Sequence, residues 1–289
     1  MSWIRRAVKR LAAEPCCGYR AEQAPYSEPT ALAALALTAH GQLDSAGRGL
    51  AWLANAQNPD GSVGPSATQR APAWPTALAI LAWASGARAY DDNVKRAVHW
   101  ALAFAGRAYP RHKEMGHDPS IPGWPWVAGT HAWVEPTAWH LIALKQTGHG
   151  VHPRAREARR LLMDRLLPEG GCNYGNTSVL GQYLRPHIAP TGLTLVALAR
   201  EADTTGQIQR SRDYLARTLS AATPTISLGY GLLGLAAQGD TPSESPRWLE
   251  AAFDRVALTH ESWKLALLLL AARADDCPLL SPLDKVAAQ

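Results

Sequence analysis

Two glutamates occupy the same place in a motif that occurs twice along the chain. Glu28 and Glu135 each precede the sequence Pro-Thr-Ala. A carboxylate at the start of a helix is stabilised by the helix dipole. A carboxylate whose pKa is raised by burial can instead serve as a general acid or base. We predict that Glu135 is a catalytic acid and that Glu28 lies in the same site, while the helix-stabilising interpretation stays open for both.

Tryptophan is concentrated just before and after Glu135. The chain has 11 Trp and only 2 Phe, and Trp124, Trp126, Trp133 and Trp139 all fall in one short stretch. Aromatic ring faces stabilise cations, as a carbocation reaction requires. The alternative is that these rings fill a core rich in Ala and Gly. The predicted substrate-binding residues are Glu28, Trp74, Trp124, Trp126, Trp133, Trp139, His140 and Tyr174.

Histidines near the same motif add a second possibility for chemistry. His131 is predicted to be catalytic together with Glu135. Imidazole and carboxylate groups suit zinc or iron, so His131, Glu135, His187 and His260 form a conceivable ligand set. Their spacing matches no known metal motif. We therefore predict no metal and no cofactor.

The elements that position these residues follow from repetition of the motif. The prolines of related segments stand at 29, 75, 136 and 190, and two weaker copies without proline are Ser227-Leu228-Gly229-Tyr230 and His260-Glu261-Ser262-Trp263. A repeat of this length is one supersecondary unit in an array. Proline is tolerated in the first turn of a helix, and the run that follows it, such as residues 30–37, is apolar on every side. Such helices must be buried on every side.

Amphipathic segments alternate with these apolar helices, at 46–58, 91–106, 153–167, 206–219 and 245–258. In the third, Arg154, Arg156, Arg160 and Arg165 are expected to point away from an apolar stripe. The alternation predicts an all-α fold, an (α/α)₆ toroid of six helical hairpins with inner apolar helices ringed by outer amphipathic ones. An open solenoid is the alternative. In a closed ring the inner helices begin at one mouth, where their dipoles favour anions.

The turns before two of the apolar helices resemble those of a known superfamily. Gln57-Asn58-Pro59-Asp60-Gly61-Ser62 and Gly170-Gly171-Cys172-Asn173-Tyr174-Gly175 are similar to the repeat motifs of terpenoid cyclases, including squalene-hopene cyclase, and protein prenyltransferases. The resemblance covers about residues 25–272 and implies an α/α toroid. The Asp-x-Asp-Asp motif of the cyclases is missing. The zinc-binding Asp and Cys of the prenyltransferases fall on Trp133 and Glu135, and only His260 matches in type.

The resemblance implies a protein that binds, cyclises or isomerises an isoprenoid or another apolar chain in a central aromatic pocket. In this hypothesis Glu135 supplies the initiating proton and the Trp residues stabilise the cation. The alternatives are a non-catalytic toroid that binds a protein or lipid partner, and a metal-dependent enzyme similar to prenyltransferases.

Composition sets the remaining expectations. The chain has 289 residues, 47% of them hydrophobic, and a formal charge of +5. We expect residues 1–24 to form a basic amphipathic helix and linker packed on the toroid, and residues 25–289 to form a single toroid domain. An alternative for residues 2–13 is peripheral contact with anionic lipid through Trp3, Ile4, Val8 and Leu11.

No segment has the composition of a signal peptide or membrane span, and a cytoplasmic location is the simplest expectation. The four cysteines are expected to be reduced. No nucleic-acid motif accompanies the sequence pI near 9.1, so the expected ligand is an apolar small molecule rather than DNA or RNA. Residues 107–120 form the longest irregular stretch and are a candidate lid or partner-binding loop. The sequence predicts no oligomeric state.

Overall fold

A computed structural model of the chain describes residues 2–86, 88–112, 115–274 and 277–280. The end of the predicted domain, residues 281–289, lies outside them. Within the described residues there are twelve α-helices, one 3₁₀ turn (Arg88–Tyr90) and one short antiparallel hairpin of β1 (Ser178–Val179) and β2 (Gln182–Tyr183).

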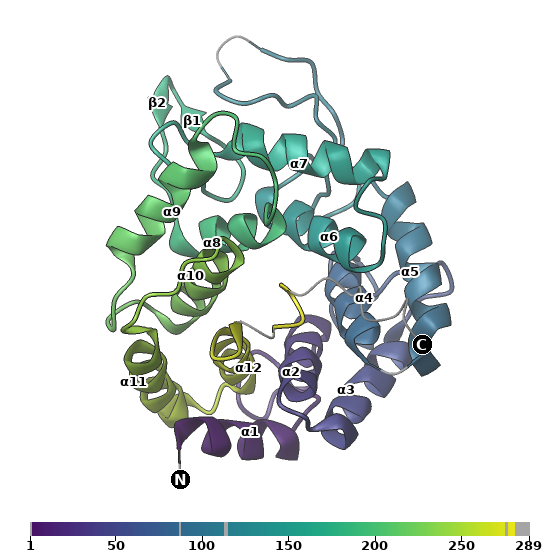
Figure 1. The fold of residues 1–289 in the computed structure, drawn as a ribbon. Coiled ribbons are helices and arrows are strands. Elements are labelled where there is room, and N and C mark those ends of the chain that lie inside the picture. The colour runs from purple at the N-terminus through teal and green to yellow at the C-terminus, as the bar shows by residue number, and fades with distance from the viewer. Residues whose placement is uncertain (1, 87, 113–114, 275–276, 281–289) are drawn as a thin grey trace.

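Six of the helices form a closed inner ring (Figure 1). They are α2 (Ser27–Ala39), α4 (Thr76–Ser85), α6 (Val134–Gln146), α8 (Ile188–Ala197), α10 (Thr225–Ala237) and α12 (Ser262–Ala271). Each packs against the next along the chain, and α12 packs against α2, which closes the ring. The predicted all-α toroid is therefore confirmed, and the solenoid alternative is wrong.

The outer layer consists of α3 (Leu43–Ala56), α5 (Asp91–Ala103), α7 (Pro153–Arg165), α9 (Gln207–Thr218) and α11 (Ser245–Thr259), with α1 (Trp3–Ala13) beside them (Figure 1). The division into layers follows composition. Every residue of α2 from Pro29 to Leu37 is buried, whereas α7 buries one stripe. Arg165 was expected to point outward, but it is only 4% exposed. It is buried because a loop packs over the end of α7.

Helix α1 takes the outer position beside the last inner helix. It packs mainly against α12 and also contacts α2, α3 and α11. Trp3 and Leu11 are buried in the core, and Ile4 and Val8 pack against it. The apolar face that the lipid-contact alternative requires is thus occupied by the fold. Across the described residues, no helix combines the length and apolar character needed to span a membrane.

The Pro-Thr motif has a structural role that repeats around the ring. In four inner helices the Thr hydroxyl hydrogen-bonds to both the backbone N–H and the C=O of one residue in the preceding loop, over 2.8 to 3.4 Å. The pairs are Thr30 with Cys17, Thr76 with Val63, Thr137 with Trp124, and Thr191 with Cys172. We call this contact the threonine clasp. It holds each loop against the start of its inner helix.

The glycines of the turn motifs dock these turns on outer helices. Gly61 and Gly170 both have φ of +94°. A Cβ atom at Gly61 would lie 2.4 Å from the carbonyl oxygen of Arg96 in α5, and one at Gly170 would lie 2.3 Å from that of Arg210 in α9. Only glycine accommodates both the left-handed backbone and the close approach. These motifs therefore specify the ring, not its chemistry.

Candidate active site at the mouth of the helix ring

Four titratable side chains meet at the end of the ring where the inner helices begin, which we call the mouth. Glu28, Glu135 and Tyr230 come from α2, α6 and α10, which are alternate helices of the inner ring. Tyr19 comes from the loop between α1 and α2. The four lie within electrostatic range of one another: Glu28 raises the pKa of Glu135, and both glutamates raise the pKa values of Tyr19 and Tyr230.

Glu28 is held by a tyrosine. The Tyr19 hydroxyl donates a hydrogen bond to Oε2 of Glu28. Burial raises the pKa of Glu28 to about 7, and the hydrogen bond from Tyr19 opposes that rise because it stabilises the ionised form. Tyr19 is fixed in turn by Trp263, whose indole N–H donates to the Tyr19 carbonyl over 2.9 Å and whose ring meets the Tyr19 ring edge-on at 5.5 Å.

Glu135 has no such support. Among the described residues, no hydrogen bond or ion pair reaches its carboxyl group. The side chain is half-buried, and burial, followed by the nearby charge of Glu28, raises the pKa of Glu135 to about 8. At neutral pH Glu135 is therefore mostly protonated, while Glu28 is about half ionised. The N-cap residues of the two helices, Tyr26 and Trp133, make no side-chain capping hydrogen bond either.

Two buried aromatic side chains, Trp139 and Tyr230, pack against each other inside the helix ring. Trp139 lies one turn beyond Glu135 on α6 and is fully buried, and Tyr230 is 3% exposed. Their ring centroids are 6.0 Å apart in an edge-to-face arrangement. Burial and the two nearby carboxylates raise the pKa of Tyr230, so its hydroxyl stays protonated. The pair is therefore a buried aromatic contact within electrostatic range of both carboxyl groups through Tyr230.

Other predicted residues lie around the rim of the mouth. Trp133 and Tyr174 line a pocket of about 280 Å³ together with His187. Trp133 also borders a second cavity, of about 370 Å³, which is where His131 lies. The half-buried rings of Trp74 and Trp126, from the loops before α4 and α6, meet edge-on with centroids 4.7 Å apart.

Trp124 and His140 lie elsewhere. Both are fully buried, and their rings stack at 4.9 Å. The Arg154 guanidinium of α7 lies 4.0 Å from the centroid of the Trp124 ring, and the Trp124 indole donates to the Ala101 carbonyl of α5 over 3.0 Å. Burial lowers the pKa of His140 to about 3, so it is a neutral core residue. Both therefore pack between the inner and outer layers rather than at the mouth, because the threonine clasp holds the Trp124 backbone and its indole reaches α5.

The histidines do not assemble a metal site. His131, His187 and His260 are all exposed. In the described part of the chain no group of three or more His, Cys, Asp or Glu side chains is arranged to hold a metal ion. No hydrogen bond joins His131 to Glu135 there either. His131 lies beside Trp133, with ring centroids 4.7 Å apart.

Sequence reasoning missed Tyr19 and Tyr230. Tyr230 stands in a weak copy of the repeat, inside the buried, otherwise apolar helix α10. A phenol in such a helix was the available signal, since buried hydroxyls are costly without a reason. The repeat gave no signal for Tyr19, because the residue nine positions before Glu135 is Trp126 and not a second tyrosine.

Comparison with known proteins adds evidence on the fold. No protein-family model and no curated protein sequence matches this chain. A glycosidase structure aligns with a TM-score of 0.59 and 14% identity over 96% of this chain and 97% of its own. A glycosidase variant in complex with glucose aligns at 0.56 and 13% identity, with 96% and 98% covered. The ent-copalyl diphosphate synthase from Streptomyces platensis aligns at 0.52 and 17% identity over 88% of this chain and 50% of that one.

The chain is an α/α toroid. At these identities the alignments show the fold alone, and they confirm the resemblance to the terpenoid cyclase superfamily at that level. The toroid spans about half the length of the diphosphate synthase and nearly the full length of the glycosidases. The same scaffold therefore occurs in proteins with quite different chemistry, and the function has to be argued from the site.

Proposed function

We propose that this protein is an acid–base catalyst that cleaves a glycosidic bond, with Glu135 as the proton donor and Glu28 as the base. The observation that carries the proposal is the unequal pair of carboxyl groups at the mouth. Glycoside hydrolysis needs two carboxyl groups, one protonated and one ionised, on either side of the scissile bond. Their environments separate the two roles, because Tyr19 donates to Glu28 while Glu135 has no donor.

The reaction follows from the protonation states. The Glu135 carboxyl group gives its proton to the glycosidic oxygen as the bond from that oxygen to the anomeric carbon breaks. A water molecule forms the new bond to that carbon and gives a proton to Glu28. Because Oε2 of Glu28 accepts the hydrogen bond from Tyr19, Oε1 is the atom that takes this proton. Exchange with solvent then removes the proton from Glu28 and returns one to Glu135. Since Glu28 must be ionised and Glu135 protonated, the rate should peak between their pKa values of about 7 and about 8.

Solved glycosidases have this fold over nearly their full length, so a toroid of this size is compatible with glycoside chemistry. The pKa of Glu135 supports the choice of a glycoside over an alkene. A carboxyl group with a pKa of about 8 is a weak acid, and an ether oxygen accepts a proton far more readily than an alkene does.

A second candidate is cyclisation or isomerisation of an isoprenoid, which the aromatic surroundings favour. Trp139 and Tyr230 pack edge-to-face, Tyr230 lies within electrostatic range of both carboxyl groups, and Trp263 packs on Tyr19. Aromatic faces there could stabilise a carbocation. In this alternative Glu135 protonates the substrate at carbon, and Glu28 accepts the proton that is lost at the end.

The experiment uses the leaving group to identify the acid. Methyl glycosides need a proton on the leaving oxygen, whereas 4-nitrophenyl glycosides hardly do. We expect Glu135→Gln to lower kcat/KM for methyl glycosides by about 10²- to 10⁴-fold and to affect the 4-nitrophenyl compounds much less. Glu28→Gln should impair both. Glu250→Gln, at an exposed position on α11, is the control.

Full activity of Glu135→Gln on the methyl glycoside would contradict the assignment. Conversion of an isoprenoid diphosphate but of no glycoside would favour the second candidate. Turnover of neither class would leave a non-catalytic scaffold as the better explanation.

A further inference from the structure

The connection between α5 and α6 is unusually long. It spans residues 104–133 and contains no helix or strand in its described part. Loops of this length inside a compact domain are usually functional. Residues 113 and 114 lie outside the described residues.

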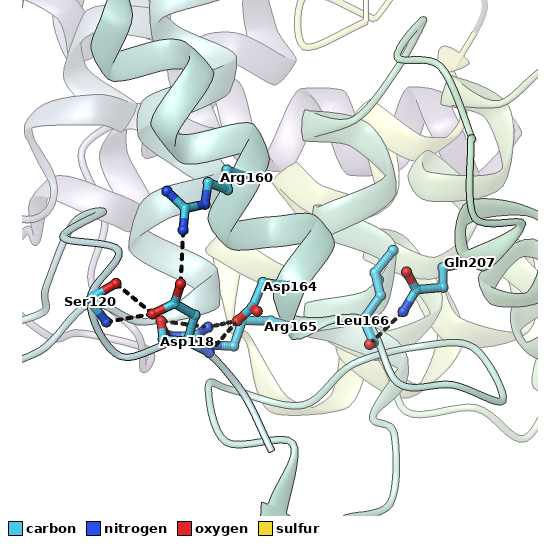
Figure 2. A network of polar contacts seen from close by, with 7 residues as sticks. All are labelled: Asp118, Ser120, Arg160, Asp164, Arg165, Leu166 and Gln207. Carbon is cyan, nitrogen blue, oxygen red and sulfur yellow. Dashed lines mark hydrogen bonds and ion pairs between the residues drawn. The ribbon is translucent and has the colours of Figure 1, made fainter. Parts of the chain in front are cut away.

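Asp118 pins this loop to α7. Figure 2 shows its side chain between Ser120 of the same loop and the end of α7. Arg160 donates to Oδ2 of Asp118 over 2.8 Å, and the backbone N–H of Asp118 donates to the Asp164 carboxylate over 2.9 Å. Hydrogen bonds from Ser120, and also the charge of Arg160, lower the pKa of Asp118. The anchor is therefore ionised and intact at neutral pH.

A cavity of about 370 Å³ lies between the anchored loop, the start of α6 and the end of α7. Its walls are mostly apolar or aromatic, with a few polar groups. The lining residues are Tyr109, Met115, His117, Pro119, Ile121, His131, Ala132, Trp133, Arg165 and Asn176. Size and composition are those of a small-molecule site. None of these residues belongs to the group of Tyr19, Glu28, Glu135 and Tyr230.

Two polar side chains of the cavity are buried at its inner wall. His117 is 8% exposed and Arg165 is 4% exposed. Nδ1 of His117 and Nε of Arg165 have no hydrogen-bond partner. Arg165 is paired with Asp164 and donates to the Asp118 carbonyl. Burying a guanidinium and an imidazole is costly, which makes their retention beside an open cavity informative.

Burial keeps His117 neutral and is the largest effect on its pKa. Arg165 and His131 also oppose its protonation, whereas Asp164 and Asp118 favour it, and together these effects lower the pKa of His117 to about 4. A neutral imidazole offers one donor and one acceptor at physiological pH. The charge of Arg165 is balanced by Asp164. The polar wall therefore suits a hydrogen-bonding group with or without a negative charge.

We propose that this cavity is a second small-molecule site, which binds a flat aromatic compound carrying a hydrogen-bond acceptor. The ring lies against Trp133 and Ile121, and the acceptor faces His117 and Arg165. The proposal is independent of the chemistry at the carboxyl groups. It assigns the described parts of this loop, residues 104–112 and 115–133, the role of forming a binding wall.

Two probes test the proposal by isothermal titration calorimetry on the full chain: 2-naphthamide and 2-naphthoate. We expect both to bind saturably with Kd below about 1 mM and to differ by less than about threefold, because Asp164 already balances Arg165. Asn176→Trp, at an exposed residue on the rim of the cavity, should weaken binding at least about tenfold by filling the entrance. Asn55→Trp, at an exposed site on α3, is the matched control and should bind as the unaltered protein does.

A second variant tests the polar wall without blocking the cavity. His117→Phe keeps a ring but removes the hydrogen-bonding nitrogens, and it should weaken 2-naphthamide by about fivefold to tenfold. Equal binding to Asn176→Trp, or the absence of saturable binding up to about 1 mM, would overturn the proposal. Loss of probe binding in Glu135→Gln would also overturn it, because the probe would then be occupying the mouth.

Discussion

The starts of α2 and α6 share one sequence motif and one backbone arrangement, but the residue nine positions before the glutamate differs between them. In both, Glu-Pro-Thr-Ala begins at the second residue of the helix, and the threonine clasps the residue 13 positions earlier. Counting nine residues back from the glutamate gives Tyr19 in one copy and Trp126 in the other. The two helix starts therefore share their threonine clasp, but a tyrosine precedes Glu28 where a tryptophan precedes Glu135.

That difference separates the pKa values of the two glutamates. Tyr19 donates a hydrogen bond to Glu28, whose pKa is about 7. Trp126 instead meets Trp74, and Glu135, with no donor, has a pKa of about 8. The repeat thus supplies two equivalent carboxyl groups, and the preceding loop distinguishes them. Under the proposed mechanism this makes one the base and the other the acid.

The largest effect should appear in stability against pH. Both glutamates have folded-state pKa values above the ordinary 4.5, so the folded protein holds these protons more tightly than the unfolded chain does. Their contribution to stability is complete below about pH 4.5 and is lost as pH rises through 7 and 8. Glu135→Gln should therefore raise the free energy of unfolding at pH 9 by about 2 kcal/mol, allowing for partial exposure.

Urea unfolding at pH 5.5 and pH 9 measures this effect. Glu28→Gln should give a smaller gain, since the pKa of Glu28 is less raised, and Glu250→Gln should give none. An unchanged pH slope in both mouth variants would show that the two carboxyl groups are not protonated as described.

The next largest effect on the free energy of unfolding should come from the threonine clasps. Thr137→Val removes both hydrogen bonds to Trp124 and leaves a buried N–H and C=O without a side-chain partner, so we expect a loss of about 2 kcal/mol in unfolding free energy. Thr30→Val should cost less, because its bonds to Cys17 are longer, at 3.3 and 3.4 Å against 3.0 and 3.3 Å. Thr225→Val, in a copy where no clasp is found in the described structure, should cost least. Equal losses at all three positions would refute the clasp as the reason for the motif.

The smallest expected effect is a shift in the pH dependence of the rate, and it tests which glutamate is the base. Tyr19→Phe removes the donor that lowers the pKa of Glu28, so that pKa should rise toward the value of Glu135. The acidic limb of the rate profile should move to higher pH by about half a unit to one unit, with the alkaline limb unchanged. Trp126→Phe, at the equivalent position, should move neither limb. A shift of the alkaline limb in Tyr19→Phe would mean that the roles of the two glutamates are reversed.

Much of the fold could be predicted because the same local sequence patterns recur in each helical hairpin. The apolar run after each proline and the stripe on each outer helix determine which layer a helix joins. The position of α1 could not be read this way. Its amphipathic pattern indicates a packed helix, but its partner α12 lies some 250 residues away, and only ring closure brings the two together.

The site could be predicted in part. Glu28 and Glu135 were found because they recur in the repeat, and both lie at the mouth. Trp124 and His140 share the same stretch of sequence but face the outer layer, and the direction of a loop side chain depends on tertiary contacts such as the clasp. Arg165 shows the same limit, since its helical position predicts exposure and the loop at Asp118 covers it.

The pairing of α1 with α12 has a consequence for how the protein is made. Helix α1 is synthesised well before α12, and its apolar stripe, with Trp3 and Leu11, packs mainly against that later helix. Until then the stripe and the two open ends of the growing arc remain exposed to other chains. Closure is thus a late event that depends on long-range contacts, the kind that slow folding most. The nascent arc is the stage at which this protein most needs protection from aggregation.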